Sequence, residues 1–285
     1  MSEAPPKSKD PAKDKGEPIV EVKDLVRKFG DRTVLNGISF KIYRGDTLII
    51  MGGSGCGKST LLRHVIGSLK PTSGSVKLFG QEITDMNEFE LNKMRKRFGM
   101  NFQFGALMQS LTVGQNVALP LMEHSDVDSS IIDLVVKMKL ELVGLTGFED
   151  LMPSEISGGM RKRVGLARAV ALDPELLFSD EPTSGLDPVM TAVVDELTLQ
   201  LTRNMGMTAM VVSHDMTSCF RIATHMLMLG TGDLQGKVVA YGTPEEIRNN
   251  PHPFLQQFIK GEPDGPIPLK LSKDAYIKRL VGEET

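Results

Sequence analysis

Residues 52–60 read GGSGCGKST, and this stretch decides the fold. It fits the pattern G-x-x-x-x-G-K-[ST], with Gly52 and Gly57 as the fixed glycines before Lys58 and Ser59. An apolar run at 47–51 precedes it like a short buried strand, and the residues after it have the apolar spacing of a helix. Strand, glycine-rich loop and helix in this order predict a loop whose backbone N–H groups surround a phosphate chain.

The loop residues have separate expected roles in binding a nucleotide. The helix N-terminus adds partial positive charge, and Lys58 is expected to reach the β- and γ-phosphates. The hydroxyl of Ser59 is expected to bind Mg²⁺. We therefore predict that ATP is bound by Gly52, Gly53, Ser54, Gly55, Cys56, Gly57, Lys58, Ser59 and Thr60.

The composition is that of a globular protein. The chain has 285 residues, of which 40% are hydrophobic and 24% charged, and its net charge of −3 gives no reason to expect nucleic acid as a partner. No apolar run approaches the roughly 20 residues of a membrane span, and residues 1–18 lack the apolar core of a signal peptide. A role at a membrane is therefore expected to depend on a partner. Cys56 and Cys219 are expected to be reduced thiols, because a disulfide at Cys56 would obstruct the loop.

Three regions are expected along the chain. Residues 1–18 are rich in proline, lysine and acidic residues, which predicts a disordered arm. Residues 19–258 alternate strand-like and helical patterns, which predicts an α/β domain with a mainly parallel sheet and a helical insertion at about 88–160. Residues 259–285 are expected to form an extended tail with a short helix at 272–281. Helix starts are marked by Asp187-Pro188 and by the capping box that begins at Thr243.

Two carboxylates follow the predicted strand at 176–178. Asp180 is expected to hold Mg²⁺ through water, and Glu181 to act as the general base toward the water that attacks the γ-phosphate. An acidic pair at a strand end also fits a solvated surface. The phosphate loop in the same chain favours the catalytic interpretation.

A second helix N-terminus suited to an anion is predicted at Ser157-Gly158-Gly159-Met160, before the helical pattern at 161–172. A simple helix cap is the alternative. Because the loop at 52–60 already supplies a phosphate site, a second one suggests that ATP is enclosed by two chains, each of which contributes one half.

These elements together resemble the ATP-binding cassette (ABC) family over about residues 19–258. The resemblance implies a P-loop NTPase cassette with a RecA-like core, an N-terminal β subdomain and a helical insertion subdomain. It implies head-to-tail homodimers in which Ser157, Gly158, Gly159 and Met160 contact the partner chain's ATP. The dimer-interface loop would be formed by Ser184, Gly185, Leu186 and Asp187.

Three further site residues follow from the resemblance alone. Gln103 would touch Mg²⁺ and the attacking water, and would link the site to a membrane partner. His214 would be the switch histidine that contacts the γ-phosphate, and Phe29 would stack on adenine. The sequence departs from the family pattern at Met160, where glutamine is usual, and at Ser179, which places a polar residue before the carboxylates.

The Ser-Gly-Gly-Met sequence and the residues at 104–107 are similar to cassettes of Mla/Mce-type lipid transporters. This implies an ATPase that drives phospholipid transport across the bacterial envelope, peripheral to the cytoplasmic side of the inner membrane. The implied partners are an MlaE-like integral-membrane permease, an MCE-domain substrate-binding protein and a small STAS-domain protein.

Several alternatives remain open at this point. A soluble ABC-type ATPase could remodel nucleic acid or cofactor assemblies, although this chain has neither long coiled coils nor a second cassette; a small-molecule P-loop kinase would lack the second anion site. Arg161, Lys162 and Arg163 fit either a solvated helix face or an anion-binding patch. Cys56, near a helix N-terminus, is either an inert filler of the loop or a redox-sensitive thiol.

Overall fold

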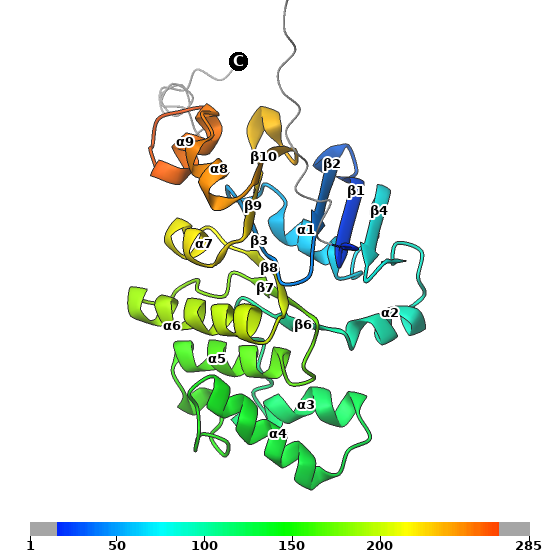
Figure 1. Ribbon diagram of the computed structural model, residues 1–285, viewed down its shortest axis with the longest axis vertical. Helices are drawn as coiled ribbons and strands as arrows, with labels where there is room; N and C mark the ends of the chain where they lie inside the picture. The colour runs from blue at the N-terminus through cyan, green and yellow to red at the C-terminus, as the bar shows by residue number, and fades with distance from the viewer. Residues whose placement is uncertain (1–15, 268–285) are drawn as a thin grey trace, which may run out of the picture.

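Two β-sheets of different character organise the chain, for which the computed structural model describes residues 16–267 (Figure 1). The larger sheet has the strand order β10-β9-β3-β8-β7-β6, and all its neighbours run parallel except the antiparallel pair β9 and β10. The mainly parallel sheet expected from the sequence is therefore confirmed. Its strands are β3 (Thr47–Gly52), β6 (Phe98–Asn101), β7 (Leu176–Asp180), β8 (Thr208–Val212), β9 (His225–Leu229) and β10 (Val238–Gly242).

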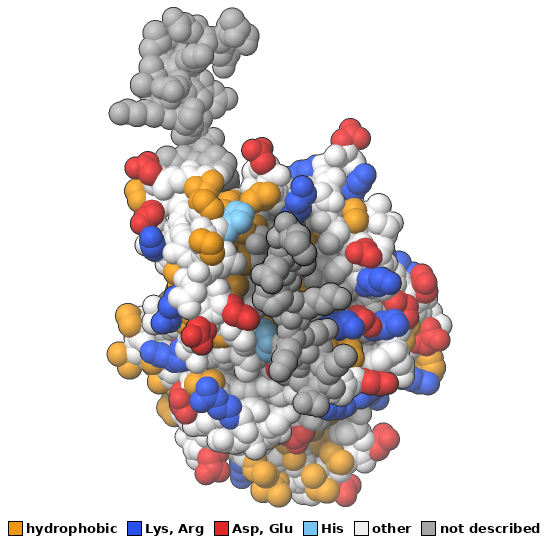
Figure 2. Space-filling view, turned by 45° about the horizontal axis from the view of Figure 1, so that its top comes forward, with side chains coloured by type: hydrophobic (Ala, Val, Ile, Leu, Met, Phe, Trp, Pro, Cys, Tyr) orange, Lys and Arg blue, Asp and Glu red, His pale blue; other side chains and the backbone are white. Residues whose placement is uncertain are grey.

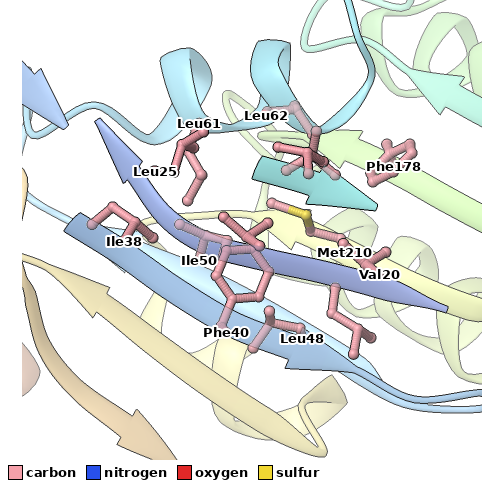
Figure 3. Packing of buried hydrophobic residues seen from close by; sticks show 14 of the residues in the cluster. Val20, Leu25, Ile38, Phe40, Leu48, Ile50, Leu61, Leu62, Phe178 and Met210 are labelled. Carbon is pink, nitrogen blue, oxygen red and sulfur yellow. The ribbon is translucent and has the colours of Figure 1, made fainter. Parts of the chain in front are cut away.

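The smaller sheet is antiparallel and has the order β2-β1-β4-β5. Its strands are β1 (Val20–Phe29), β2 (Arg32–Ile42), β4 (Ser73–Leu78) and β5 (Gln81–Glu82). Apolar residues at alternating positions of β1 and β2, such as Val20 and Phe40, pack toward Leu48 and Ile50 of β3 in a shared core (Figure 3). Leu61 of the first helix joins the same core, so the helix after the phosphate loop is fixed between the two sheets.

Nine α-helices are assigned within residues 16–267. They are α1 (Lys58–Val65), α2 (Glu88–Arg95), α3 (Val113–His124), α4 (Ser129–Leu142), α5 (Gly158–Ala169), α6 (Pro188–Leu199), α7 (Met216–Ile222), α8 (Pro244–Asn249) and α9 (Pro253–Lys260). Both helix starts predicted from capping residues are confirmed. Asp187 accepts hydrogen bonds from the N–H groups of Val189 and Met190, and Thr243 forms a capping box with Glu246.

The helices α3, α4 and α5 form a layer below the large sheet (Figure 1), around a hydrophobic core to which Leu177 of β7 and Leu197 of α6 also contribute. The segment 88–160 also contributes the four-residue strand β6, which pairs with β7 at the edge of the large sheet. The sequence pattern missed β6 because so short a strand shows little alternation. The helical layer is therefore joined to the sheet through the loop that follows β6.

The described part of the predicted C-terminal tail, up to residue 267, turns back on α9. Gly261 ends α9 in the left-handed conformation, with φ of 66°, and so reverses the chain. The N–H of Ile267 then donates to Oε1 of Gln257 at 2.7 Å, and Nε2 of Gln257 donates to the carbonyl of Glu262 at 3.2 Å. The predicted arm up to residue 15 and the predicted helix at 272–281 lie outside the described residues.

The surface carries charges of both signs, and hydrophobic side chains gather at its lower end, over the helical layer (Figure 2). Exposed apolar residues of α3 and α4 include Met122, Ile131, Leu134 and Met138. Within residues 16–267, no helix combines the length and the apolar character needed to cross a membrane.

Candidate active site

Neighbouring parallel strands bring several of the predicted site residues together at the carboxyl ends of the strands in the large sheet. Val212 at the end of β8 is opposite both Ile50 of β3 and Asp180 of β7. The phosphate loop, the two carboxylates and His214 therefore start from adjacent strand ends. Gln103 follows β6, whose last residue Asn101 is opposite Ser179, so Gln103 lies at the same end of the strands.

The backbone of the phosphate loop depends on glycine. At Gly52, φ is 144°, and a Cβ atom would lie 2.5 Å from the carbonyl oxygen of Leu229. At Gly57, φ is 108°, and a Cβ atom would lie 2.8 Å from Leu35. Lys58 then starts α1, and its Nζ donates to the carbonyls of Gly52 and Gly53 at 2.8 and 3.2 Å. The ammonium group consequently lies over the loop.

A cavity of about 400 Å³ opens beside this loop. Its wall combines the small sheet with the phosphate loop, through Phe29, Arg32, Val34, Gly55, Gly57, Lys58, Ser59 and Thr60. The ring of Phe29 is about half exposed, and the guanidinium of Arg27 lies 4.3 Å from its centroid. The cavity can hold a nucleotide with its base on Phe29 and its phosphates on the loop. Arg32 and Val34 were not predicted, because their position depends on the hairpin that turns β1 into β2.

Asp180 and Ser59 bring a carboxylate and a hydroxyl close together beside the phosphate loop. The hydroxyl of Ser59 hydrogen-bonds to the Asp180 carboxylate. Burial raises the pKa of Asp180, while this hydrogen bond and the positive charges of Lys58 and Arg63 act in the opposite direction. Oδ1 of Asp180 is buried and has no hydrogen-bond partner among the described residues. Hydroxyl and carboxylate oxygens are preferred ligands of Mg²⁺, so these two residues fit such an ion.

Glu181 and His214 are brought into direct contact, which the sequence did not predict. Nδ1 of His214 lies 2.6 Å from Oε2 of Glu181. Glu181 has a left-handed backbone, with φ of 51°, and its N–H donates to the carbonyl of Val212 at 2.9 Å. This backbone turn ends β7 and directs the carboxylate toward the residue that follows β8.

The residues Ser157–Met160 begin a helix in a different part of the molecule. The hydroxyl of Ser157 accepts a hydrogen bond from the N–H of Met160 at 3.2 Å, and Ser157 and Gly158 are exposed. The helix α5 packs against β6, α3 and α4, whereas α1 packs against β2, β3, β4, β7 and β8. The two predicted anion sites thus lie on different elements, each open to a further molecule.

The comparison with protein families uses the same segments. The family described as "ABC transporter" matches residues 35–184, from the strand β2 through both predicted anion sites to the segment after Glu181. The chain belongs to the ABC transporter family. It is therefore an ABC ATPase, which binds and hydrolyses ATP.

Proteins similar to this ABC ATPase cover most of its length. It is 41% identical over 262 residues to the "Intermembrane phospholipid transport system ATP-binding protein MlaF" of Haemophilus influenzae, an alignment that covers 92% of this chain and 98% of the relative. It is 39% identical to the "Probable ribonucleotide transport ATP-binding protein mkl" of Mycobacterium leprae, covering 90% of this chain and 72% of that protein. Among solved structures, the dimeric ATP-binding cassette MJ0796 bound to ADP and Pi is 29% identical, with a TM-score of 0.71, and the match covers 79% of this chain and 98% of that one.

The three consecutive cations of α5 were expected to form a solvated helix face or an anion-binding patch, and the structure shows neither. Arg161, Lys162 and Arg163 of this ABC ATPase form neither a solvated face nor an anion patch, because all three are half-buried and each donates to two backbone carbonyls. The guanidinium of Arg161 donates to the carbonyls of Pro153 and Ile156, and that of Arg163 donates to the carbonyls of Val143 and Gly144. Consecutive helix residues point about 100° apart, so the three side chains reach three different segments.

Both cysteines of the ABC ATPase are buried free thiols. Burial raises the pKa of the Cys56 thiol, and the charge of Lys58 only partly opposes this effect. Of the two alternatives for Cys56, the structure therefore favours the inert filler of the loop.

Proposed function

We propose that this ABC ATPase is the ATP-hydrolysing subunit of a phospholipid transport system and drives a separate integral-membrane permease. The observation that carries the proposal is the 41% identity to a phospholipid-transport ATPase across nearly the full length of both chains. The relative named for ribonucleotide transport is less identical and matches over less of its own length. Because both are named as transport proteins, a remodelling ATPase without a permease is the less supported function.

The site residues suggest how ATP is bound and hydrolysed. Lys58 and the loop N–H groups would bind the phosphates, and Ser59, Asp180 and Gln103 would hold Mg²⁺. When bound, this ion neutralises charge on the β- and γ-phosphate oxygens. Glu181 accepts a proton from the attacking water. His214 orients the Glu181 carboxylate through the 2.6 Å contact. The other nitrogen of its ring would be free to contact the γ-phosphate.

We further propose that the working unit is a head-to-tail homodimer. Ser157–Met160 of one chain would then close over the ATP held by residues 52–60 of the other. The separation of α1 from α5 in the fold supports this arrangement. The dimeric state of the similar cassette MJ0796 supports it as well. The loop from Ser184 to Asp187 would lie at the interface between the two chains.

The permease would dock at a second cavity, of about 390 Å³, between the large sheet and the helical layer. Its lining includes Phe102 and Ala106, which flank Gln103 on both sides. Phe104 in the same loop is 81% exposed. A cytoplasmic segment of an MlaE-like permease inserted here would displace Gln103 directly and so reach the site. We propose accordingly that the ATPase lies on the cytoplasmic side of the inner membrane and that MCE-domain and STAS-domain proteins are further components.

The substitution Glu181→Gln tests the catalytic assignment. It keeps the shape of the side chain but removes its basicity, so kcat should fall by about 10²-fold or more. ATP binding should persist, and an ATP-bound dimer should be visible by size-exclusion chromatography. Glu175→Gln is the matched control, because Glu175 precedes the opposite end of the same strand and pairs with Arg44 and Arg97. Near-normal hydrolysis by Glu181→Gln would contradict the assignment.

Mixing two inactive variants tests the composite site. A Lys58→Ala chain mixed with a Ser157→Arg chain forms heterodimers in which one site carries both lesions and the other carries neither. Part of the hydrolysis should therefore return. Differently tagged chains verify that heterodimers form, and crosslinking of the trapped dimer shows whether the sites close. Closed heterodimers without any activity would count against a site shared between two chains.

Purification from detergent-solubilised membranes of the native host tests the transport assignment. We expect an integral-membrane protein to co-purify with the tagged chain, and mass spectrometry should find phospholipid bound to the complex. A complex that carried ribonucleotides in its membrane component instead of phospholipid would support the other cargo. The variant Phe104→Asp should lose the membrane protein while it retains basal ATPase activity.

A further inference from the structure

One face of α5 holds the segment that follows β7. Gly159 and Lys162 are three residues apart and share this face. A Cβ atom at Gly159 would lie 3.3 Å from Met190 and 3.7 Å from Leu186. Nζ of Lys162 donates to the carbonyl of Glu181 at 3.3 Å and also to that of Ser184. A close helix approach and a cation thus fix the chain from the proposed catalytic base to the start of α6.

The same combination recurs one and a half turns later, on another face of α5. A Cβ atom at Gly165 would lie 3.0 Å from Cα of Gly105. Arg168 donates to the carbonyls of Gly105 and Ala106 at 2.6 and 2.8 Å. One helix therefore holds both the segment after Glu181 and the loop that contains Gln103.

The carbonyls bonded by Lys162 belong to a turn that is also anchored at its start, where the N–H of Glu181 donates to the carbonyl of Val212. The backbone hydrogen bonds that follow within the turn are short-range. The N–H of Ser184 donates to the carbonyl of Glu181 at 3.2 Å, and the N–H of Leu186 to that of Thr183 at 3.1 Å. Glu181 itself has a left-handed backbone, which residues with a Cβ atom rarely adopt. Such a conformation persists only where its surroundings hold it, and a charged donor on the carbonyl supplies a hold from another element.

The half-buried side chain of Lys162 brings its ammonium group within hydrogen-bond distance of both carbonyls. Burial lowers the pKa of its ammonium group, while the charge of Glu181 opposes that change. The three N–H bonds of an ammonium group allow it to serve two carbonyls at once.

We propose that Lys162 is a positioning residue for ATP hydrolysis: it fixes the backbone of Glu181 and Ser184 to α5, so that the carboxylate moves with the helix that carries Ser157–Met160. The inference rests on the proposed roles of these residues. In a head-to-tail dimer, Glu181 and Ser157 of one chain serve different ATP molecules. Lys162 therefore links the two ATP sites.

Steady-state kinetics of Lys162→Met provide the first test. We expect kcat to fall roughly 10- to 100-fold, because small misplacements of a catalytic group have effects of this size. Affinity for the fluorescent analogue mant-ATP should stay within about twofold of the original value, since Lys162 does not line the cavity beside the phosphate loop. Lys162→Arg should recover most of the activity, because a guanidinium can also donate to two carbonyls.

Arg163→Met is the matched control. Arg163 neighbours Lys162, and its guanidinium likewise donates to two carbonyls, but these belong to Val143 and Gly144 in the helical layer. This variant should keep kcat within about twofold. Equal losses of activity in the two variants would show a general weakening of α5 and would overturn the proposal. A loss of mant-ATP affinity as large as the loss of kcat would overturn it too, because Lys162 would then act on the nucleotide.

Hydrogen exchange measured by mass spectrometry provides a readout that does not depend on which group is the base. Amides of the peptide 181–190 should exchange faster in Lys162→Met than in the original protein or in Arg163→Met. Unchanged exchange in this peptide would overturn the positioning role. Glu181→Gln measured in parallel separates the two assignments: if it hydrolyses ATP normally, Glu181 is not the base, whereas the exchange result still decides whether Lys162 holds the turn.

Discussion

The helices α6 and α7 are joined by a buried carboxylate, and its removal makes a quantitative prediction. The helix α6 follows the loop 184–187, and α7 follows His214, so this contact connects two segments of the site. Asp195 of α6 is 1% exposed. It accepts a hydrogen bond from the hydroxyl of Ser218 on α7, and its Oδ2 lies 3.3 Å from Nη1 of Arg221.

The substitution Asp195→Ala should destabilise the fold by about 1–4 kcal/mol. The hydroxyl of Ser218, which is 2% exposed, would lose its acceptor, and a buried unsatisfied group costs about 1–3 kcal/mol. The ion pair adds only about 0–1 kcal/mol, because the side chain of Arg221 is 43% exposed. Asp195→Asn keeps an acceptor for Ser218 and should cost less. A loss near the middle of the range would lower the thermal midpoint by roughly 5–10 °C.

The contribution of Asp195 to the free energy of unfolding should depend on pH, in a direction set by its raised pKa. Burial raises its pKa above the usual 3.8, assisted by the negative charge of Asp215 and opposed by the hydrogen bond from Ser218 and the charge of Arg221. Between these two pKa values the folded chain holds a proton that the unfolded chain has released. The carboxyl group therefore contributes more to stability as the pH falls through the folded-state pKa toward 3.8. The stability difference between the original protein and Asp195→Asn should grow in the same direction.

Urea unfolding at about pH 5 and about pH 8 measures both effects. Thr198→Val is the control, because the Thr198 hydroxyl is also buried on α6 but donates to Val194 of its own helix. The reasoning would be refuted if Asp195→Ala cost no more than Thr198→Val. It would also be refuted if the advantage of Asp195 over asparagine increased with rising pH.

Two further predictions concern the nucleotide cavity and the thiols. Phe29→Ala should raise KM for ATP by roughly 10-fold because the stacking surface is lost, whereas Phe29→Tyr should keep KM near its original value. Phe89→Ala, which removes an exposed ring on α2, is the control. Equal KM values for the two alanine variants would exclude stacking of adenine on Phe29. Neither Cys56 nor Cys219 should react with N-ethylmaleimide in the folded protein at about pH 8, since both are buried and burial raises the pKa of Cys219 to about 12. Mass spectrometry before and after unfolding in urea checks this, and rapid labelling of Cys56 in the folded chain would indicate that the loop opens.

The parts of this structure that the sequence predicted are those with local signals. The phosphate loop requires glycines at fixed spacing, and Asp187 and Thr243 act on N–H groups two or three residues away. The direct contact between Glu181 and His214, which lie on distant segments, was not predicted. The pairing of Glu181 with His214 depends on the parallel register of β7 and β8, which no local pattern encodes.

The hydrogen bonds of Lys162 to the carbonyls of Glu181 and Ser184 were likewise not predictable from the sequence of α5. Its neighbours Arg161 and Arg163 made the segment look like a charged surface, because composition does not show which backbone carbonyls lie nearby. The strand β9, with the sequence His-Met-Leu-Met-Leu, was also not predicted; it is buried between β10 and β3.

The two attachments of α5 determine how movement would pass through the molecule. Lys162 and Arg168 are six residues apart, which corresponds to about 9 Å of helix rise. An α-helix of this length is stiff, so the two segments attached to it move together. A displacement of the Gln103 loop by a docked permease would therefore move α5, and with it the backbone of Glu181. The rate of ATP turnover would then follow the angle of a single helix rather than a relay of side-chain rearrangements.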